Sequence, residues 1–283
     1  MTAAPSSAPK ETFRLPAPFL KWVGGKRQLL PSILARIPKR IPGTYFEPFL
    51  GGGAVFFALA AENRLTRAVL SDFNVDLIET YREVRNNVDA VIGALRCHRN
   101  ESDYFYRVRS ALPQSMSPPE RAARMIFLNR CGYNGLYRVN AAGQFNVPFG
   151  RYSNPTICDE EALRAASRAL QIAELREGDF QSAMGPVDGG DVVYFDPPYV
   201  PLSATSSLTS YTQGGFDADD QRRLRDFARQ LKRRGVTVLL SNSSAEFVRE
   251  IYGKGFRWIE VDARRMVNCQ PGARGPVREL LIW

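Results

Sequence analysis

The tetrapeptide Asp196-Pro197-Pro198-Tyr199 carries the clearest chemical signal, because it follows directly after the apolar run at residues 191–195. In an open α/β sheet, ligands collect beyond the carboxyl ends of such strands. Consecutive prolines fix φ and remove N–H donors, so the Pro197 carbonyl is held rigidly beside the Asp196 carboxylate. Two acceptors and an aromatic ring suit a planar base with an exocyclic amine: the acceptors make the nitrogen more nucleophilic, and the base stacks on Tyr199. The alternative is a proline-rich turn that only ends a strand.

A second candidate site is the glycine-rich stretch at residues 47–53. Glycines allow a backbone to approach a ligand closely. The spacing is not Gly-x-Gly-x-x-Gly, so a hydride-transfer cofactor is disfavoured. Asp72 follows about 20 residues later at the end of a predicted strand, where a carboxylate suits a ribose diol. An ordinary glycine turn with an exposed aspartate would give the same pattern.

Residues 21–26, Lys-Trp-Val-Gly-Gly-Lys, match a Walker A phosphate loop only superficially. Position 20 is Leu rather than Gly, and Arg27 replaces the Ser or Thr that holds Mg²⁺ in that motif, so an NTPase is disfavoured. Trp22, beside two glycines and two lysines, could instead face a carboxylate of a ligand. The alternative is a glycine loop with solvated lysines.

These candidate residues need strands and helices to position them, and the hydrophobic pattern predicts both. Strand, glycine-rich turn, helix, strand and an acidic end is the opening of a parallel nucleotide-binding sheet. Between residues 75 and 159 the alternation stops and the pattern is helical, which indicates an insertion into a split α/β domain. The predicted strands are residues 44–49, 68–72, 192–196, 236–241, 256–262 and 277–283. The predicted helices are residues 27–37, 54–61, 75–85, 120–130, 160–173, 218–234 and 245–252.

Composition narrows the class of protein. The chain has 283 residues and a formal charge of +9, and residues 96–151 hold nine arginines against three acidic residues, which permits a polyanionic partner. No apolar run approaches the roughly 20 residues that a membrane helix needs. Residues 1–15 are expected to form a disordered tail that is no signal peptide, so we expect a cytoplasmic protein. Four cysteines without a Cys-x-x-Cys pair and a single histidine argue against a zinc site or a disulfide framework.

In combination and order, these motifs resemble the Dam-like N6-adenine DNA methyltransferases of bacteria and their phages, the D12 class. The match covers FLKWVGGK at residues 19–26, FEPFLGGG at 46–53, SD at 71–72 and DPPYVPLSAT at 196–205. The narrowest motifs, LNRCGYNGLYR at 128–138 and FNVPFGRY at 145–152, point to the branch that reads GATC. The resemblance implies a Rossmann-like S-adenosylmethionine-dependent methyltransferase sheet with an inserted, mainly helical target-recognition domain. Residues 16–74 and 160–283 would then form the catalytic domain, and residues 75–159 the insertion.

The resemblance also implies a reaction and a cofactor site. The methyl group would pass directly from S-adenosylmethionine to N6 of an extruded adenine, with no metal and no covalent nucleophile. Asp196 and the Pro197 carbonyl would bind the amine, and Tyr199 would stack on the base. The implied cofactor-binding residues are Trp22, Lys26, Phe49, Gly51, Asp72, Asp179, Phe180 and Asp196.

The implied partner is double-stranded DNA in the bacterial nucleoid, bound by a monomer or a weak dimer. Arg138 suits bidentate recognition of a guanine edge, and Lys21 matches a family lysine that reaches the first guanine. Other arginines in residues 96–130 would touch phosphates or form a solvated helix face. The loop at residues 202–215 would either order over the adenine or be only a mobile connection. Arg264 and Arg265 would add backbone contacts ahead of the loop at residues 266–276. The implied DNA-binding residues are Lys21, Tyr133, Asn134, Leu136, Arg138, Asn140, Asn146, Pro148, Arg151 and Tyr152.

Two other functions stay open at this point: a cytosine-N4 or RNA-base methyltransferase of the same fold, and a DNA-binding relative that has lost catalysis. The cytosine-C5 class is excluded because no cysteine follows a proline. His98 is expected at the surface or facing a phosphate, and the cysteines are expected to be small core residues.

Overall fold

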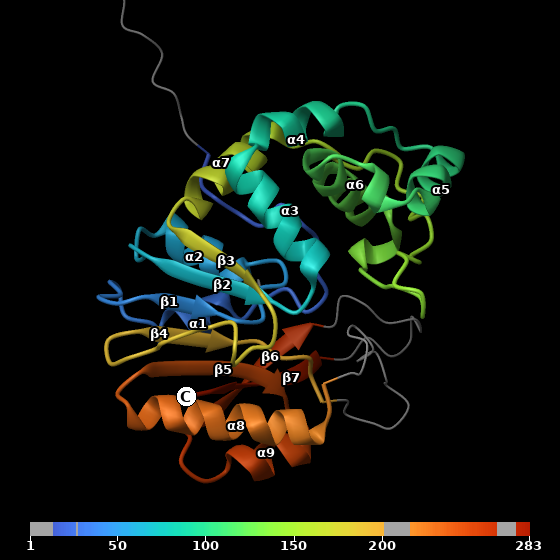
Figure 1. Cartoon of the computed structure of the whole chain (residues 1–283). Coiled ribbons are helices and arrows are strands. Elements are labelled where there is room, and N and C mark those ends of the chain that lie inside the picture. Colours follow the sequence, from blue (N-terminus) through green and yellow to red (C-terminus); the bar gives the residue numbers. More distant parts are fainter. Residues whose placement is uncertain (1–13, 27, 201–215, 265–275) are drawn as a thin grey trace, which may run out of the picture.

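A seven-stranded mixed sheet forms the centre of the molecule (Figure 1). The structure is a computed structural model, and it describes residues 14–26, 28–200, 216–264 and 276–283. The strand order is β3-β2-β1-β4-β5-β7-β6. The first five strands in this order are parallel, whereas β7 is antiparallel to both β5 and β6. The strands are β1 (Tyr45–Glu47), β2 (Ala68–Asp72), β3 (Ala173–Glu177), β4 (Val192–Phe195), β5 (Thr237–Ser243), β6 (Trp258–Arg264) and β7 (Pro276–Ile282).

Each face of the sheet has its own hydrophobic core, because side chains alternate between the two faces of a strand. In β4, Val192 and Tyr194 join one cluster while Val193 and Phe195 join the other. The first cluster lies against α1 (Leu30–Leu34), α2 (Ala54–Ala61), α3 (Val75–Asn86) and α7 (Glu160–Leu170). The second lies against α8 (Ala218–Arg233) and α9 (Glu246–Tyr252), seen below the sheet in Figure 1.

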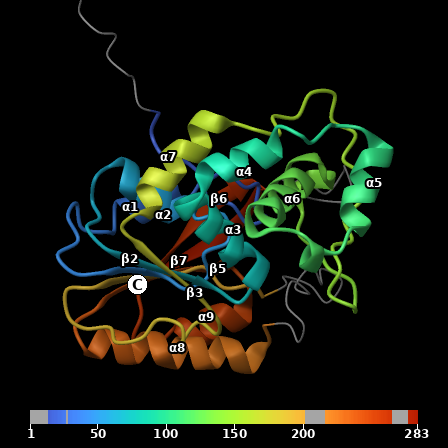
Figure 2. The same ribbon diagram turned by 45° about the horizontal axis from the view of Figure 1, so that its top comes forward.

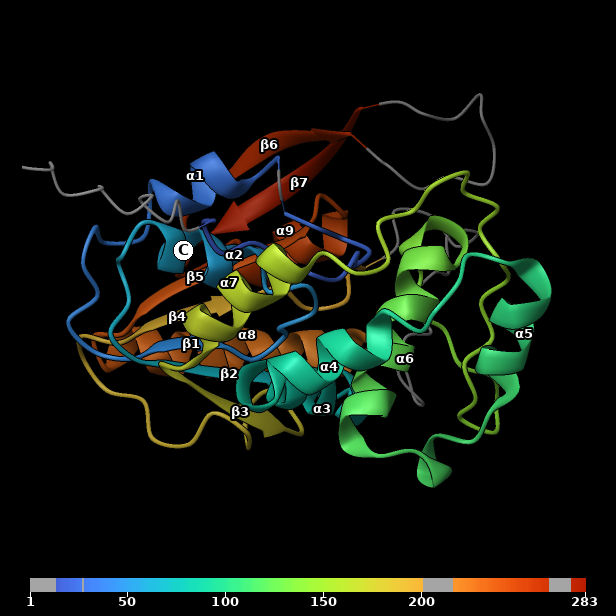
Figure 3. The same ribbon diagram turned by 90° about the horizontal axis from the view of Figure 1, so that it is seen from above.

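A helical region stands beside the sheet, between β2 and β3 in the chain (Figures 2 and 3). It contains α4 (Val88–Leu95), α5 (Ser102–Ser110), α6 (Pro118–Cys131) and the short 3₁₀ turns η1 (Pro113–Ser115) and η2 (Tyr133–Gly135). A capping box of Ser117 and Glu120 starts α6, which packs against α3, α4 and α5. Helix α3 contacts β2 and β3 as well, so it links the helical region to the sheet.

The α/β class and most predicted elements are confirmed, with four corrections. The hydrophobic pattern does not predict strand β3, because its exposed charged residues, Glu174 among them, give it no apolar run. The helix that was predicted to continue through residue 173 ends at Leu170. Helices α4 and α5 are further elements that the pattern does not predict, and the helix expected at residues 27–37 is shortened to Leu30–Leu34. The assignment of residues 75–159 to a separate domain stays a prediction.

Three smaller expectations also change. Arg14, expected in the disordered tail, pairs with Asp159 at 2.7 Å, while residues 1–13 lie outside the described part of the chain. The ring of His98 stacks on Phe127 at 4.4 Å, and burial lowers its pKa to about 4, so it is a neutral packing residue rather than a phosphate contact. Of the cysteines, Cys131 is buried but Cys97 is exposed. Among the described residues, no helix is long and apolar enough to cross a membrane.

Candidate active site and DNA-binding segment

The predicted chemical residues meet at the carboxyl ends of the parallel strands. Asp196 follows β4, the glycine turn follows β1, and Asp72 ends β2. Strands β1 and β4 are neighbours although β2 and β3 come between them in the chain, so the strand order reverses between them. Such a switch point opens a crevice where ligands bind in α/β sheets.

Asp196 is held by two side chains. Lys26 Nζ lies 2.9 Å from Asp196 Oδ2, and Ser241 Oγ donates to Oδ1 at 3.0 Å. The side chain of Lys26 is only 5 % exposed, and Asp196 is its ion-pair partner in this structure. Burial raises the pKa of Asp196, while Lys26 and Ser241 oppose the shift by stabilising the charged form.

The glycine turn is shaped by Asp72 and Trp22. Gly51 N donates to Asp72 Oδ2 at 2.9 Å, and Asn74 N donates to Oδ1 at 3.0 Å. Gly51 has a φ of 48°, and a Cβ there would lie 2.8 Å from the Trp22 indole, so glycine is required. Burial raises the pKa of Asp72, and the backbone hydrogen bonds oppose that shift. The structure therefore brings together Trp22, Gly51 and Asp72.

Asp179 and Phe180 are engaged within the protein. Phe49 stacks on Phe180 with ring centroids 5.5 Å apart, and the Arg223 guanidinium lies 4.4 Å from the Phe180 centroid. Arg223 also pairs with Asp179 at 2.7 Å. Phe180 is 3 % exposed, so protein atoms cover the ring face that a cofactor would have to contact. Its contact with a cofactor stays a prediction.

Polar residues absent from the sequence-based prediction complete the neighbourhood of Asp196. Tyr199 Oη donates to Glu279 Oε2 at 2.6 Å, which joins β7 to the Pro-Pro-Tyr turn. Gln221 Nε2 donates to the Pro198 carbonyl at 3.0 Å. The sequence feature that could have identified Ser241 is a polar residue inside an otherwise apolar strand. We use "strand-end site" for Lys26, Asp196, Tyr199, Ser241 and Glu279.

A further carboxyl group, that of Glu47, is buried near Asp196. Tyr45 Oη and Phe56 N both donate to Glu47 Oε2, at 2.9 and 3.0 Å. Burial raises the pKa of Glu47 to about 8, with the nearby Asp196 adding to the shift. Glu47 is therefore largely protonated at neutral pH.

Residues 132–152, which we call the 132–152 segment, form an irregular hairpin that projects from the end of α6. Tyr133 N donates to the Pro148 carbonyl at 2.9 Å, and the two arms also meet at a bridge between Val139 and Phe145. Asn134 has a φ of 54° in the tight turn η2. Most of the predicted DNA-binding residues are exposed: Lys21, Tyr133, Asn134, Arg138, Asn140, Pro148 and Arg151, with Leu136, Asn146 and Tyr152 half-buried.

The Arg138 side chain is oriented by the opposite arm of the hairpin. Its Nη2 donates to Asn146 Oδ1 at 2.8 Å and to the Asn146 carbonyl at 3.0 Å. By contrast, half-buried Arg124 donates to the carbonyls of Val108 and Arg109. The expectation that the arginines of residues 96–130 face phosphate or solvent is therefore wrong for Arg124.

One stretch, residues 19–26, joins the 132–152 segment to the strand-end site, and we call it the connecting segment. Asn129 Oδ1 accepts from Lys21 N at 2.8 Å, and Asn129 Nδ2 donates to the Lys21 carbonyl at 2.6 Å. Lys21 Nζ lies 4.5 Å from the Tyr152 ring centroid. At the other end of the connecting segment, Lys26 pairs with Asp196.

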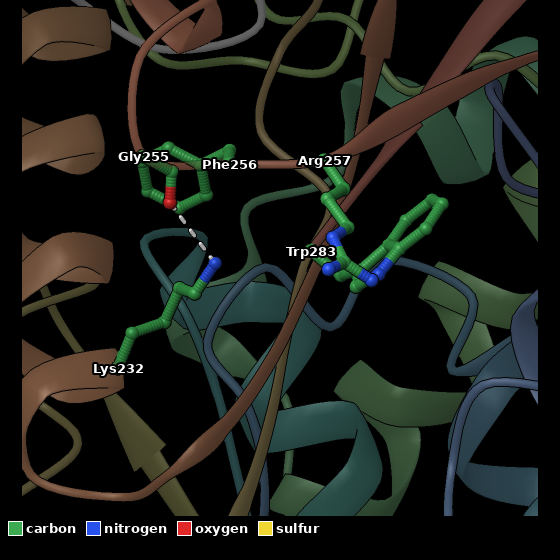
Figure 4. Close-up of a pocket in the computed structure, with 5 residues that line it drawn as sticks. All are labelled: Lys232, Gly255, Phe256, Arg257 and Trp283. Carbon is green, nitrogen blue, oxygen red and sulfur yellow. Dashed lines mark hydrogen bonds between the residues drawn. The ribbon is translucent and has the colours of Figure 1, made fainter.

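Two cavities lie outside the strand-end site. One of about 350 Å³ borders Lys21, Arg130 and Tyr152. The other, of about 400 Å³, is shown in Figure 4; Lys232, from the end of α8, donates there to the Gly255 carbonyl, and Arg257 and Trp283 lie together on the opposite side. Strand β5 starts just after α8, so this second cavity is at the opposite end of the sheet from Asp196. The predicted loops at residues 202–215 and 266–275 lie outside the described residues.

The sheet order, the glycine turn at the switch point and the Asp-Pro-Pro-Tyr turn define a Rossmann-like methyltransferase. A family model for the D12 class N6 adenine-specific DNA methyltransferases matches residues 22–267, and the chain belongs to that family. The predicted family and enzyme class are thus confirmed.

Several curated proteins are similar over nearly the whole chain. The Type II methyltransferase M1.LlaDCHI of Lactococcus lactis subsp. cremoris is 45% identical over 94% of this chain and 94% of its own length. The Type II methyltransferase M.MjaIII of Methanocaldococcus jannaschii is 43% identical over 94% of this chain and 98% of its own length. The DNA adenine methylase of Escherichia coli strain K12 is 38% identical over 93% of both chains.

Proposed function

We propose that this protein methylates N6 of an adenine flipped out of double-stranded DNA, within the sequence GATC, with S-adenosylmethionine as methyl donor. The observation that carries the proposal is the Asp196 carboxylate at the switch point, held by Lys26 and Ser241 and followed by Pro197, Pro198 and Tyr199. A carboxylate beside a rigid carbonyl and an aromatic ring matches an amine on a planar base.

The cofactor fits the chemistry of the groups around the crevice. The turn at Gly51 brings backbone close to the switch point, and the Asp72 carboxylate at the end of β2 is placed for a ribose diol. Trp22 and Lys26 lie on the connecting segment beside this turn. When bound, S-adenosylmethionine supplies an activated methyl group on its sulfonium.

The protein's own groups would act on the adenine amine. Asp196 and the Pro197 carbonyl accept hydrogen bonds from the N6 hydrogens, which frees the nitrogen lone pair for attack on the methyl group. After transfer the methylated nitrogen is positively charged, and the nearby Asp196 carboxylate stabilises that charge until the proton leaves to solvent. Lys26 orients Asp196 and favours its ionised form.

The GATC assignment rests on the motifs of the 132–152 segment and on its exposed side chains. Arg138, held by Asn146, would recognise a guanine edge, and Lys21 would reach the first guanine. Residues 75–159 would form the target-recognition domain, and residues 16–74 and 160–283 the catalytic domain. The DNA adenine methylase names of several relatives support adenine as the acceptor.

The test is transfer of a labelled methyl group from S-adenosylmethionine to duplex oligonucleotides that differ at one adenine. We expect label on N6 of the adenine in GATC, and none on a GTTC control or on GATC already methylated at N6. Equal labelling of the GTTC control would overturn the GATC assignment. Label on cytosine N4 or on RNA would overturn the acceptor, and DNA binding without transfer would identify an inactive relative.

A further inference from the structure

Glu279 is connected to Tyr199 although 80 residues separate them in the chain. Tyr199 Oη donates to Glu279 Oε2 at 2.6 Å, within the range of short hydrogen bonds to a carboxylate. Glu279 comes from β7, which pairs antiparallel with β5 through Ser243 opposite Glu279. Since Ser241 of the same β5 binds Asp196, β5 and β7 together support both ends of the Asp-Pro-Pro-Tyr turn.

Lys26 is the cation that the two carboxylates share. Its Nζ lies 2.9 Å from Asp196 Oδ2 and 4.8 Å from the centroid of the Tyr199 ring. Burial raises the pKa of Glu279, and Lys26 is the main opposing influence. The ammonium group covers one face of the Tyr199 ring, so a stacked base would have to use the opposite face.

We propose that Glu279 is a positioning residue for methyl transfer: it fixes the position of the Tyr199 ring so that the flipped adenine stacks with its amine at Asp196. This inference rests on the proposed function. A tyrosine ring can swing about its first side-chain bond, and a hydrogen bond from its hydroxyl to a strand of the sheet prevents that movement. Rotation about the second bond leaves the hydroxyl oxygen in place, and the Lys26 ammonium over the ring face restricts it. Lys26 on one ring face and Glu279 at the hydroxyl together define a single orientation.

A double-mutant cycle tests the proposal with the full-length chain. Glu279→Gln and Tyr199→Phe each weaken or remove the same hydrogen bond, from opposite ends. We expect each to lower kcat for methyl transfer to GATC by about 10- to 100-fold, because small misplacements of a substrate have effects of that size, with little change in KM for S-adenosylmethionine. The double variant should be no slower than Tyr199→Phe, since Glu279 acts only through that hydroxyl.

Glu260→Gln is the matched control, because Glu260 lies on the adjacent strand β6 and pairs with Arg249 and Arg278 at the surface. We expect it to match the wild type. Losses that multiply in the double variant, or a wild-type rate for Glu279→Gln, would overturn the positioning role alone. If Glu279→Gln does not fold, as judged by its thermal transition, a wild-type rate for Tyr199→Phe would equally overturn the positioning role. Absence of transfer by the wild type would overturn the proposed function, and the positioning role with it.

Discussion

The strand-end site and the 132–152 segment differ in how far their charged side chains are exposed to water. In the strand-end site, the charged groups are largely shielded from water and bind one another: the side chains of Lys26 and Asp196 are 5 % and 20 % exposed, and they pair at 2.9 Å. In the 132–152 segment, Arg138 and its neighbours are exposed, and the hairpin backbone holds them in place. Stabilising a developing charge needs preorganised groups in a site shielded from water, whereas reading base edges needs side chains that reach outward.

The connecting segment shows that the two regions are not independent. Arg130 Nη2 donates to the Phe19 carbonyl at 2.6 Å, and Asn129 binds both backbone groups of Lys21. Trp22 stacks on Tyr137 of the 132–152 segment at 5.6 Å and also packs against the glycine turn. Seven residues after Phe19, Lys26 reaches Asp196. The Asn-Arg pair of the family motif therefore anchors the stretch of chain that carries Lys26.

The largest effect is expected from Asp196→Asn, which should separate the two regions most sharply. The asparagine amide offers donors where the amine needs an acceptor, and Lys26 loses its counter-charge. We expect methyl transfer to fall by about 1,000-fold or more, while affinity for GATC duplex measured by fluorescence anisotropy stays within about twofold of wild type.

Asp188→Asn is the control for Asp196→Asn, since Asp188 is exposed and pairs with Arg234. It should have no effect on transfer. An Asp196→Asn variant that retains substantial turnover would contradict the assignment of Asp196. A variant that loses transfer and DNA affinity together would show that the two regions are more strongly coupled than the connecting segment suggests.

A smaller and complementary effect is expected from Arg138→Ala. Loss of a bidentate contact to guanine should reduce discrimination between GATC and a site with that guanine replaced by about 1–3 kcal/mol, or roughly 5- to 150-fold. The single-turnover rate on saturating GATC should change little, because the strand-end site is untouched. Competition between the two duplexes measures the ratio, with Arg233→Ala, exposed at the end of α8, as control. Unchanged discrimination would show that Arg138 does not contribute to recognition of the DNA sequence.

The two regions differ in how far the sequence predicts them. Asp196, Gly51 and Asp72 follow strands that are short apolar runs, so their meeting at one sheet edge could be predicted. Glu279 could not, because its position depends on β7 lying antiparallel between β5 and β6, and no local pattern encodes that order. The contact of Ser241 with Asp196 depends on the pairing of β5 with β4, two strands that are separated in the chain by α8. Strand β3 is not predicted because an edge strand with exposed Glu174 and Glu177 lacks an apolar run. The motifs of the 132–152 segment could be recognised in the sequence, but the anchoring role of Asn129 could not, because its three partners, the amide and carbonyl of Lys21 and the carbonyl of Gly135, are backbone groups.

The smallest effect concerns stability and tests how well the strand-end site is shielded from water. Glu47 is 3 % exposed, and burial raises its pKa to about 8 from the ordinary 4.5. Between these values the folded protein keeps a proton that the unfolded chain releases, so the free energy of unfolding falls as pH rises, by up to about 1.4 kcal/mol per pH unit. Above pH 8 this contribution levels off, because both states are ionised.

Glu47→Gln should remove that dependence while its amide oxygen still accepts from Tyr45 Oη and Phe56 N. In urea unfolding, we expect the variant to gain about 2 kcal/mol relative to wild type between pH 6 and pH 8. Glu161→Gln, at an exposed position in the first turn of α7, should instead follow the wild-type curve. Parallel curves for Glu47→Gln and wild type would mean that water reaches Glu47. The contrast between the two regions would then weaken, because the buried side of the strand-end site would be as solvated as the 132–152 segment. The charge of Asp196 would then be stabilised by its side-chain partners such as Lys26, and not by the exclusion of water.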